Sequence, residues 1–369
     1  MGKCCAPLEY GMNAAAKEFD GENKYIRITD IDDDSQQYLT DDIVSPDGTL
    51  EGKYLVREND ILFARTGASV GKSYLYNKKD GKLYFAGFLI RAHVKSENNA
   101  AFIFYQTQLK RYQKWVAIMS TRSGQPGINA QEYESYSVYL PNIAEQRKIT
   151  NFITLLDTRI LAQNKILQHL ESLIKGLNEK VLWQYKSKVA LHEILKERNE
   201  RTTINNQHPV ISSTAKGLFL QSEYFDKEVA SADNVGYKVL RKGNIVLSPQ
   251  NLWLGNINYN DKYEIGIVSP SYKTFTISEE FNPFYVACLL RTYRALYEYA
   301  CVSEQGASVV RRNLDMEAFM EISFPMPSID EQNRIAEGLQ TIYKKLQVEK
   351  ALLDKYRVQK QYLLQQMFI

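Results

Sequence analysis

Two segments of the sequence carry residue types that could bind phosphate or a metal ion. Residues 67–73, GASVGKS, are similar to a phosphate-binding loop, but three residues separate their glycines where that motif requires four. Residues 46–53, PDGTLEGK, contain Asp47 and Glu51, which are too close in sequence to hold one metal from neighbouring strands, and Asp47-Gly48 is typical of a turn. Neither segment predicts catalysis. A glycine-rich loop able to approach a phosphate backbone is the better interpretation of residues 67–73.

The other residues that could act as metal ligands or nucleophiles are scattered. The four histidines show no HExxH spacing, and Cys4, Cys5, Cys288 and Cys301 form no CxxC pair. We therefore expect no catalytic residue, no metal site and no cofactor bound by this chain itself. Unpaired cysteines in a chain of this length are typical of the cytoplasm. No stretch reaches the ~18 apolar residues of a membrane span, so no membrane partner is expected.

Basic residues suggest a different chemistry, namely contact with nucleic acid. The net charge is only +3, but Ala100–Ala130 contains no acidic residue, and arginines gather in a similar place in the second half of the chain. Basic side chains on helices suit phosphate contacts, whereas Arg, Gln and Asn on loops can reach base edges. An ordinary solvated basic face is the alternative interpretation.

The candidate DNA-binding residues fall into these two groups. On predicted helices, as candidate phosphate contacts, are Lys110, Arg111, Lys114, Arg291 and Arg294. On loops near glycines, as candidate base contacts, are Arg65, Lys72, Arg122, Gln125, Gln250, Asn251, Arg311 and Arg312.

A repeated motif indicates which elements position these residues. LPNIAEQRKI at 140–149 returns as MPSIDEQNRI at 326–335, so that Glu331 follows Glu145 by 186 residues. Asn142 and Ser328 are good helix N-caps, and a glutamate at the third helical position is typical of a capping box. The motif therefore predicts the start of a helix in both halves of an internally duplicated chain.

Each predicted helix continues with a heptad pattern. Apolar residues follow at alternating steps of four and three, and both copies place a polar residue, Gln163 or Glu349, at the same position. This period of 3.5 is typical of a coiled coil, and we expect the two helices to pair antiparallel as a rod between two globular ends. The predicted seam residues are Ile149, Ile153, Leu156, Ile160, Leu167, Leu170, Ile335, Leu339, Ile342, Leu346, Leu353 and Tyr356.

Two globular units, residues 1–140 and 187–326, precede the predicted spacer helices at 141–186 and 327–369. Short β-like runs such as ILFAR and NIVLS predict strands, and FYQTQLKRYQK at 104–114 matches FYVACLLRTYR at 284–294. The expected fold class is α+β, with two globular domains joined by antiparallel coiled-coil helices and related by a pseudo-twofold repeat. The first unit lacks a match for VALHEILKER at 189–198. Either the chain starts internally within its repeat, or this unit borrows the C-terminal end of the second helix.

The duplicated P-x-x-x-E-Q-x-x-I helix entry, with a divergent unit before each copy, resembles the specificity subunits of type I restriction-modification systems. YIRITDI and RTGASVGK are also similar to target-recognition domains of that family. The resemblance implies that each unit reads one half of a bipartite double-stranded DNA target. It also implies that the spacer helices dock two methyltransferase subunits, joined by restriction subunits where these are present.

S-adenosylmethionine and ATP would then belong to those partner subunits, and this chain would be a non-catalytic component of their complex. A duplicated protein-binding scaffold and a silent orphan specificity subunit remain the alternatives at this point.

Overall fold

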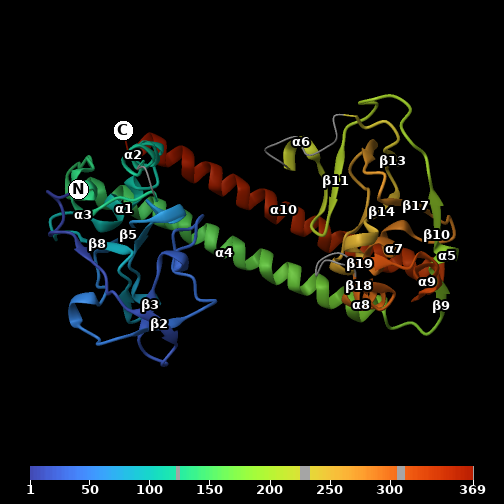
Figure 1. Ribbon diagram of the computed structural model, residues 1–369, viewed down its shortest axis with the longest axis horizontal. Helices are drawn as coiled ribbons and strands as arrows, with labels where there is room; N and C mark the ends of the chain where they lie inside the picture. Colours follow the sequence, from blue (N-terminus) through green and yellow to red (C-terminus); the bar gives the residue numbers. More distant parts are fainter. Residues whose placement is uncertain (122–124, 225–232, 306–311, 369) are drawn as a thin grey trace. The chain divides into compact units, whose positions relative to one another are not determined.

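The computed structural model describes residues 1–121, 125–224, 233–305 and 312–368, and the chain forms two compact units. Unit 1 comprises Met1–Gln163 and Leu352–Ile369, and unit 2 comprises Asn164–Ala351. Each unit therefore contains one sheet domain and part of each of two long helices, α4 (Ile143–Leu182) and α10 (Ile329–Met367) (Figure 1).

A four-stranded antiparallel sheet forms the centre of unit 1. Its strand order is β1-β8-β5-β6, formed by Glu9–Tyr10, Leu89–His93, Asp60–Ala64 and Ser73–Leu75. Every residue of β5 is buried, which explains why this strand reads as a continuous apolar run rather than an alternating one.

Smaller elements surround this sheet. β2 (Ala15–Glu18) pairs with β4 (Val44–Asp47), and β3 (Lys24–Ile26) pairs in parallel with β7 (Leu83–Phe85). The helices α1 (Ala100–Gln106), α2 (Lys110–Met119) and α3 (Ala130–Ser135) then lead to α4. Short 3-10 turns cover Ile28–Asp30, Gly52–Tyr54, Gly67–Ser69 and Lys78–Asp80.

Unit 2 repeats this topology. Its central sheet has the order β10-β17-β14-β15, formed by Leu195–Arg198, Lys273–Ile277, Asn244–Leu247 and Ile257–Tyr259. The helices α7 (Pro283–Leu289), α8 (Tyr293–Cys301) and α9 (Met316–Glu321) follow the sheet as α1, α2 and α3 do in unit 1. The predicted internal duplication is therefore present in the strand order as well as in the sequence.

The remaining elements of unit 2 complete the domain. β9 (Lys188–Ala190) pairs with β20 (Ser323–Pro325), β11 (Ile211–Thr214) with β12 (Gly217–Leu220), β13 (Lys238–Arg241) with β16 (Ile265–Val268), and β18 (Ser303–Gln305) with β19 (Arg312–Leu314). Short helices cover Leu191–Ile194 (α5), Gln221–Tyr224 (α6) and the 3-10 segment Pro249–Leu254 (η5).

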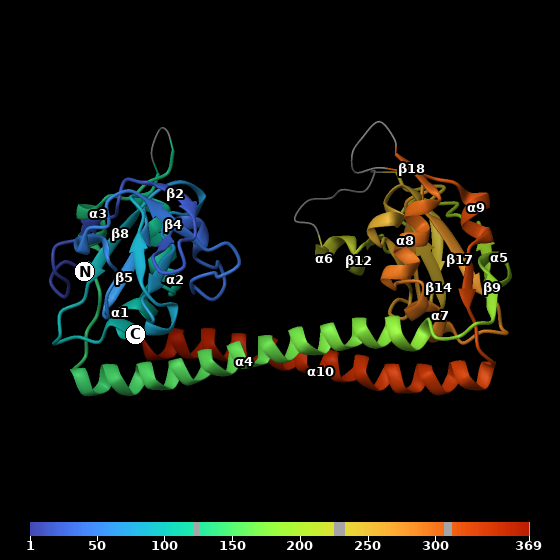
Figure 2. The same ribbon diagram turned by 90° about the horizontal axis from the view of Figure 1, so that it is seen from below.

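The two long helices run antiparallel within each unit. In unit 2, Glu171 of α4 pairs with Lys350 of α10 at 2.9 Å, and Asn178 of α4 donates to the Tyr343 hydroxyl of α10 at 3.1 Å. Residue numbers along α4 therefore increase where those along α10 decrease. In unit 1, Asp157 of α4 pairs with Lys360 of α10 at 2.7 Å. The sheet domain of each unit lies on one side of these helices (Figure 2).

The end of α10 completes the core of unit 1. Leu364 and Phe368 belong to the same buried cluster as Ile153 of α4, and the Phe368 ring lies 4.7 Å from that of Phe102 in α1. Unit 1 therefore uses the C-terminal turns of the second long helix, and unit 2 uses the end of α4 in the same way, since Leu182 belongs to its buried cluster.

The predicted strands are present with two differences. Of YIRIT, only Tyr25 and Ile26 lie in a strand (Lys24–Ile26), because the chain then turns into Ile28–Asp30, and LYFAGFLIRAHV is two strands separated around Gly87. The sequence alignment of the basic helices is wrong. The sequence alignment pairs Phe104 with Phe284. In the structure, α1 and α7 begin at the equivalent N-caps Asn99 and Asn282, and this match pairs Phe104 with Ala287.

In the described part of the chain, the helices lack the combination of length and apolar character that a membrane crossing requires.

Candidate nucleic-acid interface

In unit 1, the loop that follows the central strand β5 meets the segment that follows α2. Gly67 donates its backbone N–H to the Pro126 carbonyl at 3.0 Å, and Ile128 donates to the Arg65 carbonyl at 2.9 Å. The Arg65 guanidinium lies 4.9 Å from the centre of the Tyr10 ring. Gln125 is exposed beside Gly67, where a Cβ atom would come within 3.1 Å of the Gln125 amide nitrogen. The structure thus brings the predicted base-contacting residues Arg65 and Gln125 together.

Unit 2 builds a corresponding cluster from η5 and β19, which pack against each other. Gln250 is exposed and Asn251 is half-buried, both on η5 between the central strands β14 and β15. Arg312, the first residue of β19, places its guanidinium 4.2 Å from the centre of the Trp253 ring of η5. In place of the predicted loops, these residues occupy a 3-10 helix and a strand end. They nevertheless lie together, and we call Gln250, Asn251, Trp253 and Arg312 the η5–β19 cluster.

Two predicted residues lie outside the described part of the chain. They are Arg122, next to the Gln125 segment, and Arg311, next to β19.

The basic residues on α2 differ in how free they are. Lys110 and Lys114 are exposed, and no ion pair is recorded for either within the described residues. Arg111 is half-buried instead, because its guanidinium donates to the Gln106 side chain at 2.6 Å and lies 4.7 Å from the centre of the Tyr139 ring. Of these three, Lys110 and Lys114 are the side chains available to a phosphate.

Arg291 does not lie on a helix, contrary to the sequence-based expectation, because α7 ends at Leu289 and α8 starts at Tyr293. The Arg291 guanidinium donates to the Asn258 side-chain oxygen and, at 3.0 Å, to the Ala215 carbonyl. It thereby joins the β11–β12 hairpin to the central sheet.

Arg294 and Lys72 also have partners in the protein. Arg294 lies on α8 as predicted, 3.8 Å from the Glu179 carboxylate of α4 and 5.7 Å from the Trp183 ring. Lys72 pairs with Asp33 at 2.5 Å and its side chain is 18% exposed. A nucleic acid would have to compete with these contacts.

Sequence reasoning missed the residues that fix each sheet domain to the long helices. Gln146 accepts a hydrogen bond from the Asn99 backbone N–H at 2.9 Å and donates to the Pro141 carbonyl at 2.8 Å. Asn99 in turn caps α1, since its side chain accepts from the Phe102 N–H. Gln146 is 2% exposed, so both of its bonds are shielded from water.

Unit 2 contains the same arrangement. Gln332 accepts from the Asn282 N–H and donates to the Pro327 carbonyl, each at 2.9 Å, and Asn282 caps α7. We call the Gln146 and Gln332 arrangements the glutamine joints. The repeated Glu-Gln pair was the available signal, but it was interpreted through its glutamate alone.

The glutamate of the motif behaves as a capping residue only in part. Its backbone N–H donates to the side chain of the N-cap residue, from Glu145 to Asn142 at 3.0 Å and from Glu331 to Ser328 at 3.4 Å. The Glu331 carboxylate, however, accepts from the Tyr185 hydroxyl at 2.7 Å and from Arg334 at 2.6 Å. These bonds keep the Glu331 pKa below its usual range, the Arg334 bond contributing most.

The predicted seam residues face inward. Gln163 and Glu349 are 5% and 7% exposed, so the polar positions lie within the seam as expected from the heptads. The fully buried members are Ile153, Leu156, Leu167, Leu339, Leu346 and Leu353, and the half-buried members are Ile149, Ile160, Leu170, Ile335, Ile342 and Tyr356.

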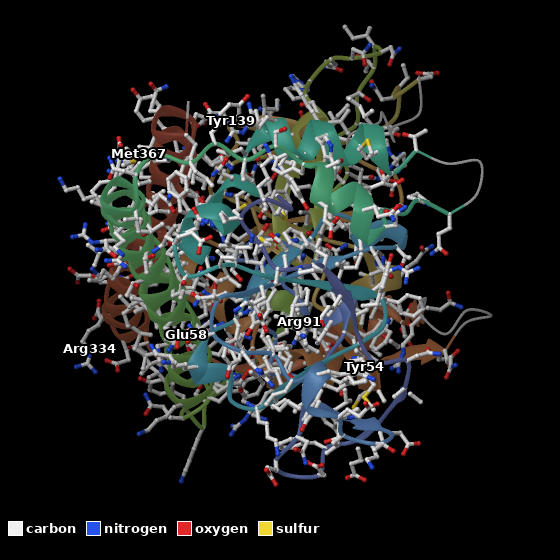
Figure 3. All side chains as sticks on the ribbon, turned by 90° about the vertical axis from the view of Figure 1, so that its left-hand side faces the viewer. Tyr54, Glu58, Arg91, Tyr139, Arg334 and Met367 are labelled. Carbon is white, nitrogen blue, oxygen red and sulfur yellow. The ribbon has the colours of Figure 1, made fainter. Side chains whose placement is uncertain are left out.

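Buried charges in unit 1 connect the strands of the central sheet, and Asp60 of β5 also lies 2.7 Å from His93 Nδ1 of β8. Arg91 (labelled in Figure 3) lies within the central sheet. Its guanidinium pairs with Glu9 and Asp60 on the two neighbouring strands and lies 5.1 Å from the centre of the Phe85 ring. Burial raises the pKa of Asp60, which also accepts from the Arg57 backbone N–H at 2.7 Å. In unit 2 the matching turn uses a neutral residue, Asn244, which accepts from the Arg241 N–H.

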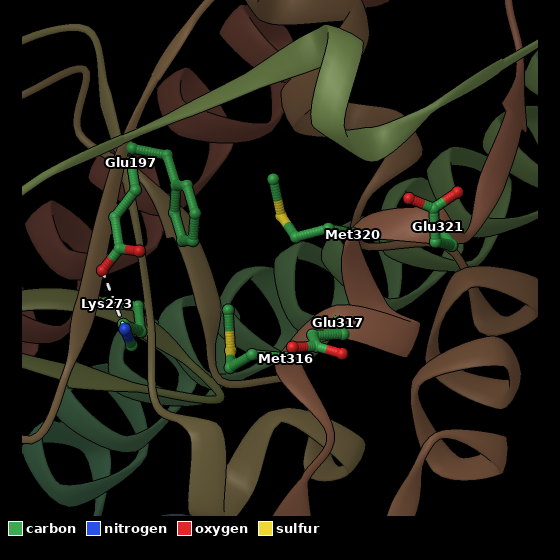
Figure 4. Close-up of a pocket in the computed structure, with 7 residues that line it drawn as sticks. Glu197, Lys273, Met316, Glu317, Met320 and Glu321 are labelled. Atoms are coloured by element: carbon green, nitrogen blue, oxygen red, sulfur yellow. Dashed lines mark hydrogen bonds and ion pairs between the residues drawn. The ribbon is translucent and has the colours of Figure 1, made fainter.

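An open hollow of about 500 Å³ in unit 2 lies between α9 and the strands β10 and β17 (Figure 4). Its lining residues are Glu197, Lys273, Phe275, Met316, Glu317, Met320 and Glu321. Because Lys273 is already paired with Glu197 at 2.8 Å, the lining carries an excess of carboxylates and does not suit DNA. No group of three or more potential metal ligands occurs among the described residues.

Comparison with known proteins shows relatives over most of the chain. The family model described as type I restriction modification DNA specificity domain matches residues 11–172 and again residues 191–355. The specificity subunit of the type I restriction enzyme MjaVIII from Methanocaldococcus jannaschii is 22% identical over 365 residues, covering 88% of this chain and 82% of that protein.

Two solved structures share the fold. The S subunit of a type I restriction-modification system from M. genitalium has a TM-score of 0.58 at 15% identity, covering 98% of this chain and 93% of its own. A structure described under complex assembly and conformational transition of the type I R-M system has a TM-score of 0.57 at 13% identity, covering 100% and 96%. With the family model matched twice, this chain belongs to the family of type I restriction-modification DNA specificity subunits.

Proposed function

We propose that each sheet domain reads one half of a bipartite double-stranded DNA target. The observation that carries this proposal is the repetition of one cluster in two chemical versions. Both units place polar and guanidinium side chains beside the loop that follows the central strand. The residues differ, however, since unit 1 has Arg65 and Gln125 there and unit 2 has the η5–β19 cluster. Two different readers on matching scaffolds suit a target with two different half-sites.

Residue roles follow from where each side chain lies and from the strength of its contacts in the protein, Arg65 donating only a long hydrogen bond of 3.5 Å to the Gly87 carbonyl. We propose that Arg65, Gln125, Gln250, Asn251 and Arg312 contact bases, because they lie beside the loops of the two clusters. Lys110 and Lys114 are proposed to contact phosphates, since they are exposed and carry charge without recorded partners. Arg111, Arg291, Arg294 and Lys72 are assigned mainly to holding the fold, because each already has a partner in the protein.

We further propose that the long helices, within residues 141–186 and 327–369, dock two methyltransferase subunits. Exposed apolar residues on these helices support docking. Phe152 and Leu155 of α4 are 44% and 64% exposed, and Val348 of α10 is 62% exposed. S-adenosylmethionine would be supplied by the methyltransferase and ATP by restriction subunits, and the chain itself would perform no catalysis. The four free cysteines suit a cytoplasmic complex.

A domain exchange tests this proposal. Residues 1–140 are replaced by the equivalent domain of a relative with a known bipartite target, and the chimera is expressed with the methyltransferase subunit in a host lacking other methylation. We expect one block of the methylated motif to change while the other block and the gap stay constant, because the helices are unchanged. Simultaneous change of both blocks, or binding to random duplex that ignores salt concentration, would contradict independent reading of DNA by the two domains.

A further inference from the structure

The η5–β19 cluster of unit 2 contains a guanidinium that lies over an aromatic ring. The Arg312 guanidinium carbon lies 4.2 Å from the centre of the Trp253 ring, the shortest such distance recorded in the described residues. This contact restrains the guanidinium, and because Nε is buried, its two terminal nitrogens are the donors left for bidentate binding. The side chain is half-buried, so its orientation is restricted before any ligand arrives.

The hydrogen-bonding state of Arg312 points to a ligand outside the chain. Its Nε is buried and has no hydrogen-bond partner among the described residues, and no ion pair is recorded for it there. The Nε of Arg111 in unit 1 is also buried without a partner, but another nitrogen of that guanidinium donates to Gln106, whereas no hydrogen bond from the Arg312 side chain is recorded among the described residues. In unit 2, Arg241 bonds to Glu200 at 2.7 Å and Arg291 bonds to Ala215. A buried donor without a partner costs free energy, which a fold tolerates more readily where binding supplies the acceptor.

Neighbouring residues favour a base edge over a lone phosphate. Gln250 and Asn251 lie on the same 3-10 helix as Trp253 and carry amide groups, which suit base edges. An arginine fork pairs with the O6 and N7 acceptors of guanine, and amides pair with adenine. We propose that Arg312, positioned by Trp253, reads a guanine in the half-site bound by unit 2. This inference rests on the proposed function and adds the base and the residue that recognises it.

The test compares motif relaxation in variants of the full chain. Wild type, Arg312→Ala, Trp253→Leu and Trp253→Phe are each expressed with the methyltransferase subunit, and methylated sites are sequenced. In Arg312→Ala, discrimination at one G·C position of one block is expected to fall about 5- to 100-fold, with the second block unchanged. Trp253→Leu should relax the same position because the platform is lost, whereas Trp253→Phe should retain most of the discrimination.

Arg241→Ala is the matched control, since Arg241 is an exposed arginine of the same unit paired with Glu200. Its motif should equal that of wild type. A uniform fall in methylation at all sites in Arg312→Ala would assign Arg312 to phosphate and overturn the proposal. Relaxation at an A·T position, or an unchanged motif with normal stability, would overturn it as well.

A loss of thermal stability in Arg312→Ala would lower methylation without any change in base readout. Trp253→Phe avoids this difficulty, because it keeps both Arg312 and an aromatic platform. If that variant alters the motif at unrelated positions, the stacking argument fails. Absence of any split motif in wild type would instead refute the proposed function, so the two failures are distinguishable.

Discussion

The glutamine joint of unit 2 gives the sharpest prediction about what fixes a recognition domain to the helices. Gln332→Met keeps the size and flexibility of the side chain but removes its bonds to the Asn282 N–H and the Pro327 carbonyl. Gln332 is 2% exposed, so water cannot easily replace either bond. An unsatisfied buried group costs ~1–3 kcal/mol, and two such groups give an expected loss of about 2–6 kcal/mol in the unfolding free energy of unit 2.

The control lies next to it in the sequence. Asn333 bonds to the same residue, accepting from the Asn282 side chain at 2.8 Å, but the bond is exposed. Asn333→Ala should therefore change stability by no more than ~0.5 kcal/mol. A larger loss of stability in Gln332→Met than in Asn333→Ala would then be due to the buried bonds of the glutamine joint and not to contact with Asn282 in general.

Urea unfolding is followed by tryptophan fluorescence, and replacing Trp115 by Phe leaves Trp183 and Trp253 to report unit 2, since Trp115 is the tryptophan of unit 1. Gln332→Met should shift the unit 2 transition and speed amide exchange at the first turn of α7, where Tyr285 donates to Asn282. A loss no larger than that of Asn333→Ala would refute the reasoning, as would equal shifts in both units.

Three further outcomes are expected. Lys360→Met should destabilise unit 1 by ~1–2 kcal/mol, because the Lys360–Asp157 pair is largely buried. Lys350→Met removes a half-exposed pair and should cost less than ~0.5 kcal/mol. The urea midpoints of the two variants are compared, and equal losses of stability would contradict the argument. Arg241, and secondarily Arg198, hold the Glu200 pKa below its usual 4.5. A carboxyl group whose pKa is lowered by folding stabilises the fold at pH values above its unfolded pKa, so unit 2 should lose stability as pH falls below about 4.5. Glu200→Gln should weaken this pH dependence, measured by urea unfolding at graded pH. A pH dependence equal to that of wild type would exclude this role of Glu200. Arg291→Ala should accelerate amide exchange in Ile211–Leu220 with little effect on β18–β19, and unchanged exchange in the hairpin would count against its structural role.

The long helices could be predicted because their signal is local. Each seam residue is specified by neighbours three and four positions away, and Asn142 and Ser328 mark both helix starts. The duplication of the sheets followed from short apolar runs such as β5 and β14, which are buried in every residue.

What the sequence did not reveal depends on contacts between distant segments. The Gln146 bond to Asn99 joins residues that no local pattern relates. The alignment of the basic helices was shifted by three residues because it matched the Phe-Tyr pairs at 104–105 and 284–285, whereas the N-caps Asn99 and Asn282 set the structural match. Arg291 was placed on a helix because the turn between α7 and α8 has no glycine or proline to mark it. Among candidate DNA contacts, residue type alone could not separate the free Lys110 from the paired Lys72.

The central claim is that this chain gives a methyltransferase its DNA target. Base-resolved methylation sequencing of host DNA, with the gene intact and deleted, tests it most directly. The account predicts that deletion removes methylation from one split motif, consisting of two short defined blocks around a fixed gap, and that the returned gene restores it. An unchanged methylation pattern in a host that expresses the partner methyltransferase would contradict the account.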